Sequence, residues 1–252
     1  MKKITAIGFD LFNTLITVEP PTLADAIDRL IMSLRDSGFP LEDESFKKAY
    51  RESAMKFVRR AREDGRETHN SLWISAALEN GGEPVPPDDP RIGEAVERYF
   101  SAFYDHVHLI PGTEAMLGTL KEDYALGLLS NFTHGPAARE ILRRTGLNAW
   151  FETILISGEL GYRKPHPLVF QKLAEQLGVR EEQMIYIGDD PDPDVHGAQR
   201  AGLQPVWTTY VRDNKVPLVP GMIHSGLERP DFEVPQISAW EDLFLFLKTL
   251  KA

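Results

Sequence analysis

The sequence predicts an α/β protein with a doubly wound, mainly parallel sheet and an inserted domain made of helices. Three observations lead to this prediction. Short apolar runs alternate with helix-length amphipathic segments in the second half of the chain. The stretch from about Pro20 to His108 has helical character without a clear strand. The chain has 252 residues, which is long enough for one core domain that carries such an insert.

Apolar runs bounded by turn residues predict strands that are buried on both faces, as in a parallel sheet. The runs cover residues 4–9, 125–129, 153–156 and 184–187, and a weaker one covers 205–209. Helices are predicted at 137–145, 168–177 and 194–201, each followed by a glycine, and a terminal helix is predicted around 243–247. Strands that alternate with helices in this way are typical of a doubly wound sheet.

The region between the first two strands predicts a second domain. Pro20 and Pro21 open it, and the pair Pro111-Gly112 closes it. Residues 81–91 are rich in proline, which predicts a loop between helices. We therefore expect an α/β core domain at residues 1–17 and 109–252, and a helical domain at residues 18–108 that can move against the sheet.

Composition and charge argue against several classes of protein. Apolar residues make up 42% and charged residues 26%, as in ordinary globular domains. A net charge of −10 disfavours nucleic acid and anionic membranes as partners. The chain has no cysteine, so it has no disulfide, thiolate nucleophile or cysteine-bound metal. The first apolar run ends at Asp10, which is too early for a secretory leader, and no stretch approaches the roughly 20 apolar residues of a membrane helix. We expect a cytoplasmic monomer or homodimer.

Polar residues follow the predicted strands at the points where chemistry is expected. Asp10 follows the first strand, with Thr14 placed to hydrogen-bond it, and Ser130 and Asn131 follow the second strand. Taken alone, Asp10 could equally be a turn residue, and Ser130 or Asn131 could be a helix N-cap. As ligand groups, they would lie where open α/β sheets bind their ligands, beyond the carboxyl ends of the strands.

Charged residues follow the third and fourth predicted strands. Lys164 lies in a loop that Pro165 and Pro167 stiffen. Four aspartates crowd into one short segment, residues 189–194, and such carboxylates repel one another unless a cation neutralises them. Mg²⁺ suits oxygen ligands of this kind. All four clusters should converge at one edge of one sheet.

This order of motifs resembles the haloacid dehalogenase-like (HAD) hydrolase superfamily over nearly the whole chain. The segment from Asp10 to Thr14 is similar to its first motif, Ser130 to its second and Lys164 to its third. The fourth motif is matched by Asp189 and Asp194 in Gly-Asp-x-x-x-x-Asp. The helical insert resembles the cap of the subgroup that carries it after the first motif. The resemblance implies a Rossmann-like core and a hydrolase acting on a small anionic molecule.

The resemblance also implies covalent catalysis by a carboxylate. Asp10 would attack the substrate, Ser130 would hold the transferring group, and Lys164 would offset negative charge. The expected substrate contacts are Thr14, Asn131 and Phe12.

The family's phosphate-handling members imply a metal site as well. Mg²⁺ would be held by Asp10, the main-chain carbonyl of Phe12 and Asp189, and would neutralise the approach of one anion to another. Asp194 would orient Lys164 or metal-bound water from behind.

One position departs from the phosphatase pattern. Phe12 stands where phosphatases of the family carry a second aspartate that protonates the leaving oxygen, help that is typically worth about 10²–10⁴-fold. The family's haloacid dehalogenases have an aromatic residue there. The leading hypothesis is a Mg²⁺-dependent hydrolase of a small phosphorylated metabolite. The alternatives are a 2-haloacid dehalogenase and a catalytically silent binding protein.

Overall fold

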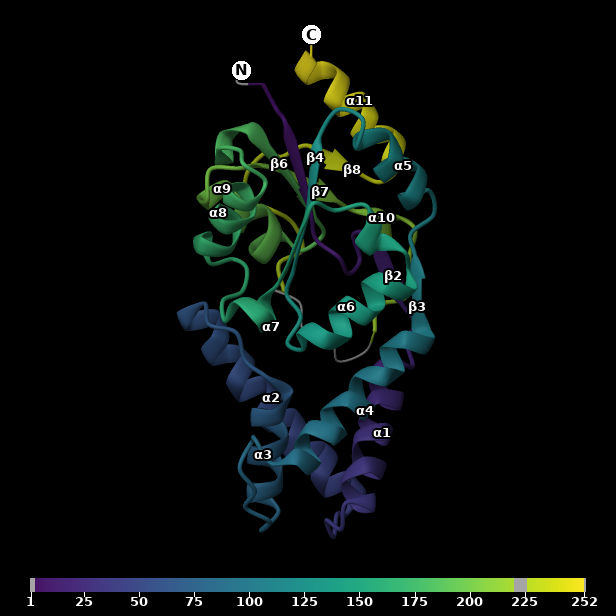
Figure 1. Cartoon of the computed structure of the whole chain (residues 1–252), viewed down its shortest axis with the longest axis vertical. Coiled ribbons are helices and arrows are strands. Elements are labelled where there is room, and N and C mark those ends of the chain that lie inside the picture. Colours follow the sequence, from purple (N-terminus) through teal and green to yellow (C-terminus); the bar gives the residue numbers. More distant parts are fainter. Residues whose placement is uncertain (1–2, 220–225, 252) are drawn as a thin grey trace.

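The computed structural model of the chain describes residues 3–219 and 226–251. Figure 1 shows an α/β body that carries both ends of the chain and a group of helices that extends from the opposite end. The main sheet of the body has the order β5-β4-β1-β6-β7-β8, and its neighbouring strands are parallel. The chain thus has the parallel α/β fold that the sequence predicts.

The strands lie close to the predicted apolar runs. They are β1 (Ala6–Phe9), β4 (Ala125–Ser130), β5 (Thr153–Ile156), β6 (Met184–Gly188), β7 (Gln204–Thr208) and β8 (Gln236–Ile237). The first strand begins two residues later than predicted. The sequence did not predict β8, because two paired residues carry no periodic signal.

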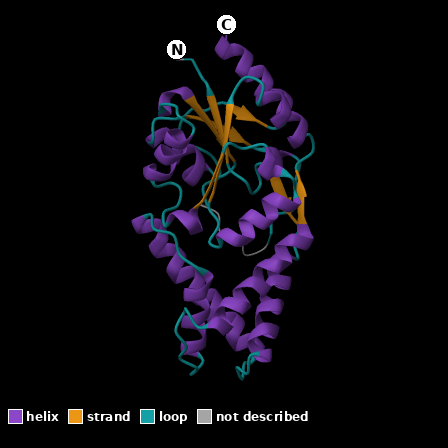
Figure 2. Cartoon of the chain, in the orientation of Figure 1, coloured by secondary structure: helices purple, strands orange, loops and turns teal. Residues whose placement is uncertain are grey.

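Helices cover both faces of the sheet (Figure 2). They are α5 (Thr113–Leu120), α6 (Gly135–Arg144), α8 (Pro167–Gln176), α9 (Gly197–Arg200) and α11 (Trp240–Lys251). Ala6 belongs to the apolar cluster that contains α8, whereas Ile7 and Phe9 belong to the other cluster. Gly8 faces α8 as well, and a Cβ atom there would lie 2.9 Å from Leu173. Both faces are buried, which explains the unbroken apolar character of the strand.

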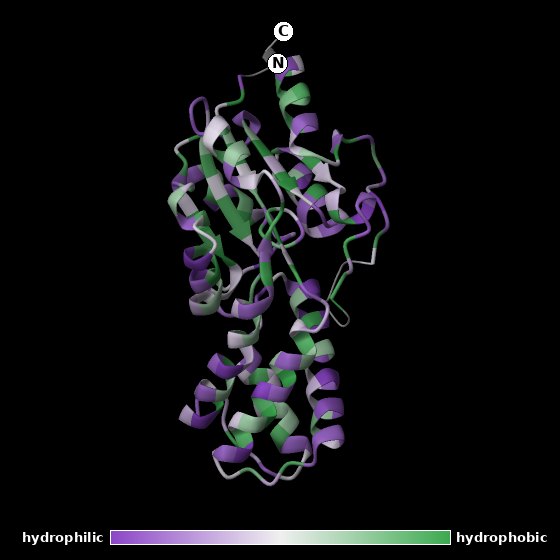
Figure 3. Ribbon diagram, turned by 90° about the vertical axis from the view of Figure 1, so that its right-hand side faces the viewer, coloured by the Kyte–Doolittle hydropathy of each residue, from purple (hydrophilic) through white to green (hydrophobic). Residues whose placement is uncertain are grey.

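The expected helical insert consists of four helices, drawn below the body in Figure 1. They are α1 (Thr22–Asp36), α2 (Asp43–Asp64), α3 (Asn70–Asn80) and α4 (Pro90–His106), and we call them the cap helices. Figure 3 shows apolar residues gathered toward the middle of this group. Leu30 and Leu34 on α1 and Ile92 on α4 are fully buried. Helices α1 and α4 thus each turn an apolar face toward the interior of the group.

The loop predicted at 81–91 is shorter than expected. Helix α4 begins at Pro90, and the side chain of Asp89 accepts a hydrogen bond from the amide of Arg91 at 2.9 Å. Proline suits the first turn of a helix, because that position needs no N–H donor and the ring fixes φ near the helical value. The proline content therefore marked both a loop and the start of the next helix.

Two short strands join the cap helices to the body. They are β2 (Ile16–Val18) and β3 (Val107–Leu109), which pair antiparallel. The sequence did not reveal them, because three residues are too few to show alternation. The expected domain boundaries at 17/18 and 108/109 fall inside these strands, and the division into two domains stays a prediction.

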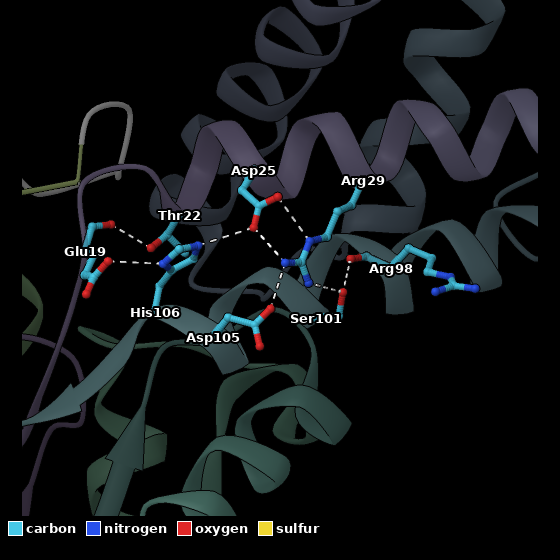
Figure 4. Close-up of polar contacts among 8 residues, drawn as sticks. All are labelled: Glu19, Thr22, Asp25, Arg29, Arg98, Ser101, Asp105 and His106. Atoms are coloured by element: carbon cyan, nitrogen blue, oxygen red, sulfur yellow. Dashed lines mark hydrogen bonds and ion pairs between the residues drawn. The ribbon is translucent and has the colours of Figure 1, made fainter.

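A polar network beside these strands ties α1 to α4 (Figure 4). The guanidinium of Arg29 donates to Asp25 at 2.8 Å, to Asp105 at 2.7 Å and to Ser101 at 2.9 Å. His106 lies 3.2 Å from Glu19 and 3.3 Å from Asp25. The network fixes the two helices at the point where the chain leaves and re-enters the body.

The remaining elements are short. They are α7 (Ser157–Leu160), α10 (Tyr210–Asp213), the 3₁₀ turns Leu147–Ala149 and Glu181–Gln183, and a wide π-type turn at Pro191–His196. The terminal helix predicted around 243–247 is α11, whose Leu243 and Leu247 are buried against the core. Among the described residues, none of the helices combines the length and the apolar character needed to cross a bilayer.

Candidate active site

The polar clusters that the sequence singled out meet at the carboxyl edge of the sheet. Asp10 follows β1, Ser130 ends β4, and Asp189 follows β6, while Lys164 reaches the same place from the loop after α7. All four residues line a cavity of about 580 Å³. The opposite wall of this cavity comes from α1, α2, α3 and α4, so the cavity lies between the sheet edge and the cap helices.

Lys164 is the centre of a buried charge cluster. Its ammonium group lies 2.5 Å from Asp10 and 2.6 Å from Asp194, and donates to the hydroxyl of Tyr186 at 2.9 Å. The whole residue is 3% exposed. Burial by itself lowers the pKa of Lys164, but the adjacent carboxylates of Asp10 and Asp194 raise the pKa well above its ordinary value. The cluster therefore keeps Lys164 charged, with two carboxylates held on it.

Asn131 holds the Lys164 loop in place. Its side-chain carbonyl accepts from the amide N–H of Lys164 at 2.8 Å, and its NH₂ group donates to the carbonyl of Lys164 at 2.9 Å. The Lys164–Pro165 peptide bond is cis. Asn131 lines the cavity, but both ends of its amide are engaged with the main chain of Lys164. The structure therefore favours a positioning role for Asn131 over the substrate contact that the sequence predicted.

Tyr186 was not identified from the sequence. It lies inside β6, where an apolar run gives no sign of a functional hydroxyl. Its hydroxyl donates to the main-chain carbonyl of Leu129 at 2.9 Å while it accepts from Lys164. Tyr186 thereby links the strand that carries Ser130 to the lysine. Tyr186 faces α8, as its position in the alternation along β6 predicts. Alternation alone does not distinguish a functional tyrosine from a core residue.

Three carboxylates lie close enough to share one cation. Oxygen atoms of Asp10, Asp189 and Asp194 all lie within 4.8 Å of one another. Burial and the neighbouring carboxylates of Asp194 and Asp10 raise the pKa of Asp189 well above its ordinary value. A divalent cation with oxygen ligands would relieve this repulsion. The residues present therefore fit Mg²⁺.

The segment that follows β6 departs from the predicted helix at 194–201. It makes one wide turn at Pro191–His196 before α9 begins at Gly197. Pro191 and Pro193 lie in the first turn of this segment, where a missing N–H group costs no helical hydrogen bond. The turn brings the carboxylate of Asp194 within 2.9 Å of the amide N–H of Asp190. Wide turns of this kind often mark functional sites.

Gly188 makes room for this arrangement. A Cβ atom at position 188 would lie 2.3 Å from the carboxyl carbon of Asp194. Any side chain there would push Asp194 away from Lys164. Trp207 on β7 adds a further constraint, since its indole N–H donates to the main-chain carbonyl of Asp189 at 2.8 Å.

The hydroxyl groups of Ser130 and Thr14 differ in what they can contact. Neither has a hydrogen-bond partner among the described residues, although both side chains are buried. Ser130 lines the cavity, so its hydroxyl is placed to bind a ligand oxygen. Thr14 is not part of the wall that the described residues form, and its predicted hydrogen bond to Asp10 is not made. Helix α6 has His134 as its N-cap, so neither Ser130 nor Asn131 caps it.

The side chain of Phe12 belongs to an aromatic wall. It stacks on Phe132 with ring centroids 5.1 Å apart and meets Phe103 edge-on at 6.4 Å. Asn13, which follows it, has a positive φ of 58° and turns the chain close to Asp10. The wall continues along the cap helices through residues that the sequence assigned to structure or did not single out. The other aromatic residues that line the cavity are Tyr50, Trp73, Tyr99 and Phe100.

A loop of the cap helices docks beside the Lys164 loop. The side chain of Glu67, between α2 and α3, is fully buried and accepts from Arg163 at 3.0 Å and from the hydroxyl of Ser157. The main chain of Arg163 also donates to Gly65 at 3.0 Å. No sequence pattern indicates this contact, because it joins residues nearly a hundred positions apart. Of the residues in this contact, Arg163 lines the cavity.

The comparison with protein families agrees with this geometry. A family model described as haloacid dehalogenase-like hydrolase matches residues 4–202. The chain therefore belongs to the haloacid dehalogenase-like hydrolases.

The chain is also similar to individual relatives and to solved structures. The chain is 29% identical to a ribulose-1,5-bisphosphate 5-phosphatase of Halopiger xanaduensis, over 80% of this chain and 83% of the relative. It is 28% identical to a glyceraldehyde 3-phosphate phosphatase of Pyrococcus furiosus, over 83% and 82%. Its fold matches the 2-haloacid dehalogenase of Pseudomonas syringae with a TM-score of 0.68 and 24% identity, over 98% and 99% of the two chains.

Proposed function

We propose that this chain is a Mg²⁺-dependent hydrolase that releases phosphate from a small phosphorylated metabolite, with Asp10 as the nucleophile. The observation that carries the proposal is the cluster at the cavity floor. There the carboxylate of Asp10 is paired with the ammonium of Lys164. The carboxylate of Asp189 and the hydroxyl of Ser130, which has no partner among the described residues, lie nearby. The similarity to two sugar- and triose-phosphate phosphatases supports phosphate as the transferring group.

The residues of the chain divide the work as follows. A carboxylate oxygen of Asp10 attacks the phosphorus, and the hydroxyl of Ser130 donates to a phosphate oxygen. Lys164 stays protonated and compensates the charge that collects on the transferring group. Asp194 and Asn131 hold Lys164 at this position, one through its ammonium group and the other through its main chain.

The proposed metal site uses Asp10, Asp189 and the main-chain carbonyl of Phe12. When bound, Mg²⁺ would screen the negative charge of the phosphate from that of the attacking carboxylate. Asp194 belongs to the same carboxylate group but is committed to Lys164.

A panel of small phosphomonoesters tests this function. Phosphate release is measured with and without Mg²⁺, beside the variant Asp10→Asn. We expect release that needs Mg²⁺ and that disappears in the variant, because an amide oxygen is a poor nucleophile. Release that persists in Asp10→Asn, or the absence of release from every ester, would contradict the proposal.

The apolar side chain of Phe12 favours one second candidate, a 2-haloacid dehalogenase. Halide leaves without being protonated, so this chemistry has no need of an acid at position 12. The carboxylates of Asp189 and Asp194 argue against it, because they would repel an anionic haloacid in the absence of a cation. Halide release from short 2-haloacids without metal would establish this alternative. A catalytically silent binding protein is excluded by any turnover that depends on Asp10.

A further inference from the structure

The cavity shows which kind of phosphate ester the proposed reaction can take. Attack on phosphorus places the leaving oxygen roughly in line with the nucleophile, on the side away from Asp10. That direction points from the sheet edge into the cavity, toward the cap helices. The residues along this direction therefore decide how the leaving group departs.

One wall of the cavity is a continuous surface of aromatic carbon. The rings of Phe12, Phe103 and Phe132 contact one another, with centroids 5.1 to 6.4 Å apart. Phe100 extends the surface, 5.1 Å from Phe132. Rings of this kind can pack against a ligand, but they have no proton to give.

The two tyrosines and the Asp28 carboxylate on the cap side are poor proton donors. Burial raises the pKa of Tyr50 well above its ordinary value, and its hydroxyl accepts from the side-chain amide of Asn70 at 2.9 Å. Burial raises the pKa of Tyr99 to about 12, so its proton is held more tightly than in free tyrosine. Asp28 is paired with Lys47 at 3.1 Å. Lys164, the closest protonated group to Asp10, is committed to two carboxylates.

We propose that the cavity is built for aryl phosphates, whose ring contacts the aromatic wall and whose phenolate leaves without an acid. This inference rests on the proposed function and names its substrate class. A phenol has a pKa of about 10, as in tyrosine, whereas an alcohol, like water, is a far weaker acid. An aryl oxygen therefore departs as the anion far more readily than an alkyl oxygen does.

The reaction balances in two steps. In the first, an oxygen of Asp10 forms a bond to phosphorus, the bond from phosphorus to the aryl oxygen breaks, and its electron pair leaves as phenolate. In the second, water attacks the phosphorus and the Asp10 carboxylate is released. The proton lost by the water neutralises the phenolate in solution, so the products are a phenol and inorganic phosphate.

Two matched esters separate the ring from the acidity of the leaving group. Phenyl phosphate and benzyl phosphate both carry an aromatic ring, but benzyl phosphate leaves as an alkoxide. With the full chain and Mg²⁺, we expect kcat/KM for phenyl phosphate to exceed that for benzyl phosphate by about 10²–10⁴-fold, the range that a general acid would otherwise supply. The ratio kcat/KM reports the steps up to transfer to Asp10, so a slow second step does not mask the difference.

Variants of Phe12 test the cause. Phe12→Asp introduces an acid, which should raise kcat/KM for benzyl phosphate. The ratio of kcat/KM for phenyl phosphate to that for benzyl phosphate should then fall at least 10-fold. Phe12→Leu introduces no acid, so the ratio should stay the same. If Phe12→Asp fails to fold, a series of substituted phenyl phosphates on the wild-type chain gives the same information. In that series log(kcat/KM) should fall steeply as the pKa of the phenol rises.

Binding of the ring is measured separately with phosphonates that cannot be hydrolysed. Phenylphosphonate should inhibit about 10-fold more tightly than ethylphosphonate, and Phe103→Leu should reduce that advantage. The control is Phe57→Leu, the same change on α2 at a half-buried residue outside the cavity wall that the described residues form.

The outcomes distinguish this inference from the proposed function. Equal kcat/KM for phenyl and benzyl phosphate, or equal inhibition by the two phosphonates, would overturn the inference and leave the phosphatase standing. Phosphate release from neither ester, with alkyl phosphates equally inert, would overturn both.

Discussion

Asn13 shows how a single residue shapes the site. It has a φ of 58°, and its main-chain N–H donates to the main-chain carbonyl of Ile16 at 2.7 Å. Asparagine tolerates this left-handed conformation better than other residues that carry a Cβ atom, and glycine tolerates it best. The turn at Asn13 follows Phe12 directly, so it sets where the aromatic wall begins relative to Asp10.

We expect Asn13→Ala to lower the free energy of unfolding by about 1 kcal/mol, because alanine is strained at a positive φ. Asn13→Gly is the matched control, since it removes the same side chain without that strain. Urea denaturation of both variants measures the difference. Equal stability of the two would mean that the backbone at position 13 is not strained.

Lys164 should affect both the rate of phosphate release and the stability of the fold. Lys164→Met removes the cation that two buried carboxylates share. We expect phosphate release to fall by at least 10²-fold, and the free energy of unfolding to fall by about 3 kcal/mol, because an uncompensated charge is left buried. Steady-state kinetics and urea denaturation measure the two effects. A variant with wild-type turnover would remove Lys164 from the proposed mechanism.

At the scale of elements, the loop between α2 and α3 holds the cap helices on the body. Glu67 reaches from this loop to Arg163, whose side chain is 16% exposed while that of Glu67 is fully buried. The backbone of the loop adds two more bonds, from Glu67 to Gly161 and from Arg163 to Gly65, both 3.0 Å long. This contact is separate from the β2–β3 pair, which also links the cap helices to the body.

We expect Glu67→Ala to lower the free energy of unfolding by about 3 kcal/mol, because it leaves Arg163 largely buried without its carboxylate. Glu63→Ala is the control, since Glu63 is exposed near the end of α2 and has no ion pair among the described residues. Chemical denaturation compares them. If both substitutions have the same small effect, the buried ion pair does not hold the loop.

The network in Figure 4 allows a second comparison between helices. Arg29→Met removes the bonds to Asp25, Ser101 and Asp105, and we expect it to cost about 1 kcal/mol, because these groups are partly exposed. Arg98→Met should change stability by less than about 0.5 kcal/mol. Arg98 takes part in the network through its main-chain carbonyl alone, which accepts from Ser101 at 2.7 Å. Thermal unfolding of the two variants measures the contrast, and equal shifts would contradict a role for the guanidinium of Arg29.

Elements differ in how well the sequence predicts them, and the reason is physical. The strand at 153–156 and the four polar clusters were predictable, because burial on both faces leaves an unbroken apolar run and parallel strands end at one edge. The wide turn at 191–196 and the short strands β2 and β3 were not, since their geometry comes from contacts distant in sequence. The same holds for Tyr186 and Glu67, whose partners lie on other elements.

At the scale of the whole molecule, the site is destabilising without a cation. Burial and neighbouring carboxylates raise the pKa of Asp189 above the value of about 3.9 that the unfolded chain would show. The folded chain therefore binds more protons than the unfolded chain between these two values, and metal-free stability falls as pH rises through that window. A bound cation would reverse the loss, which links folding to the proposed Mg²⁺ site.

The variant Asp189→Asn tests this link, because it removes both the repulsion and a metal ligand. Without metal, we expect Asp189→Asn to be at least as stable as the wild-type chain above pH 5, and to show a weaker decline as pH rises. Mg²⁺ at about 100 times its dissociation constant should stabilise the wild-type chain by about 2.7 kcal/mol. For a chain of this size that is roughly 5–10 °C in Tm, and the variant should gain much less. Thermal unfolding with and without Mg²⁺ measures both effects, and the order of stability should therefore invert when the metal is added. If Mg²⁺ raised the Tm of both chains equally, the cation would bind elsewhere, and the repulsion at Asp189 would have no role in its binding.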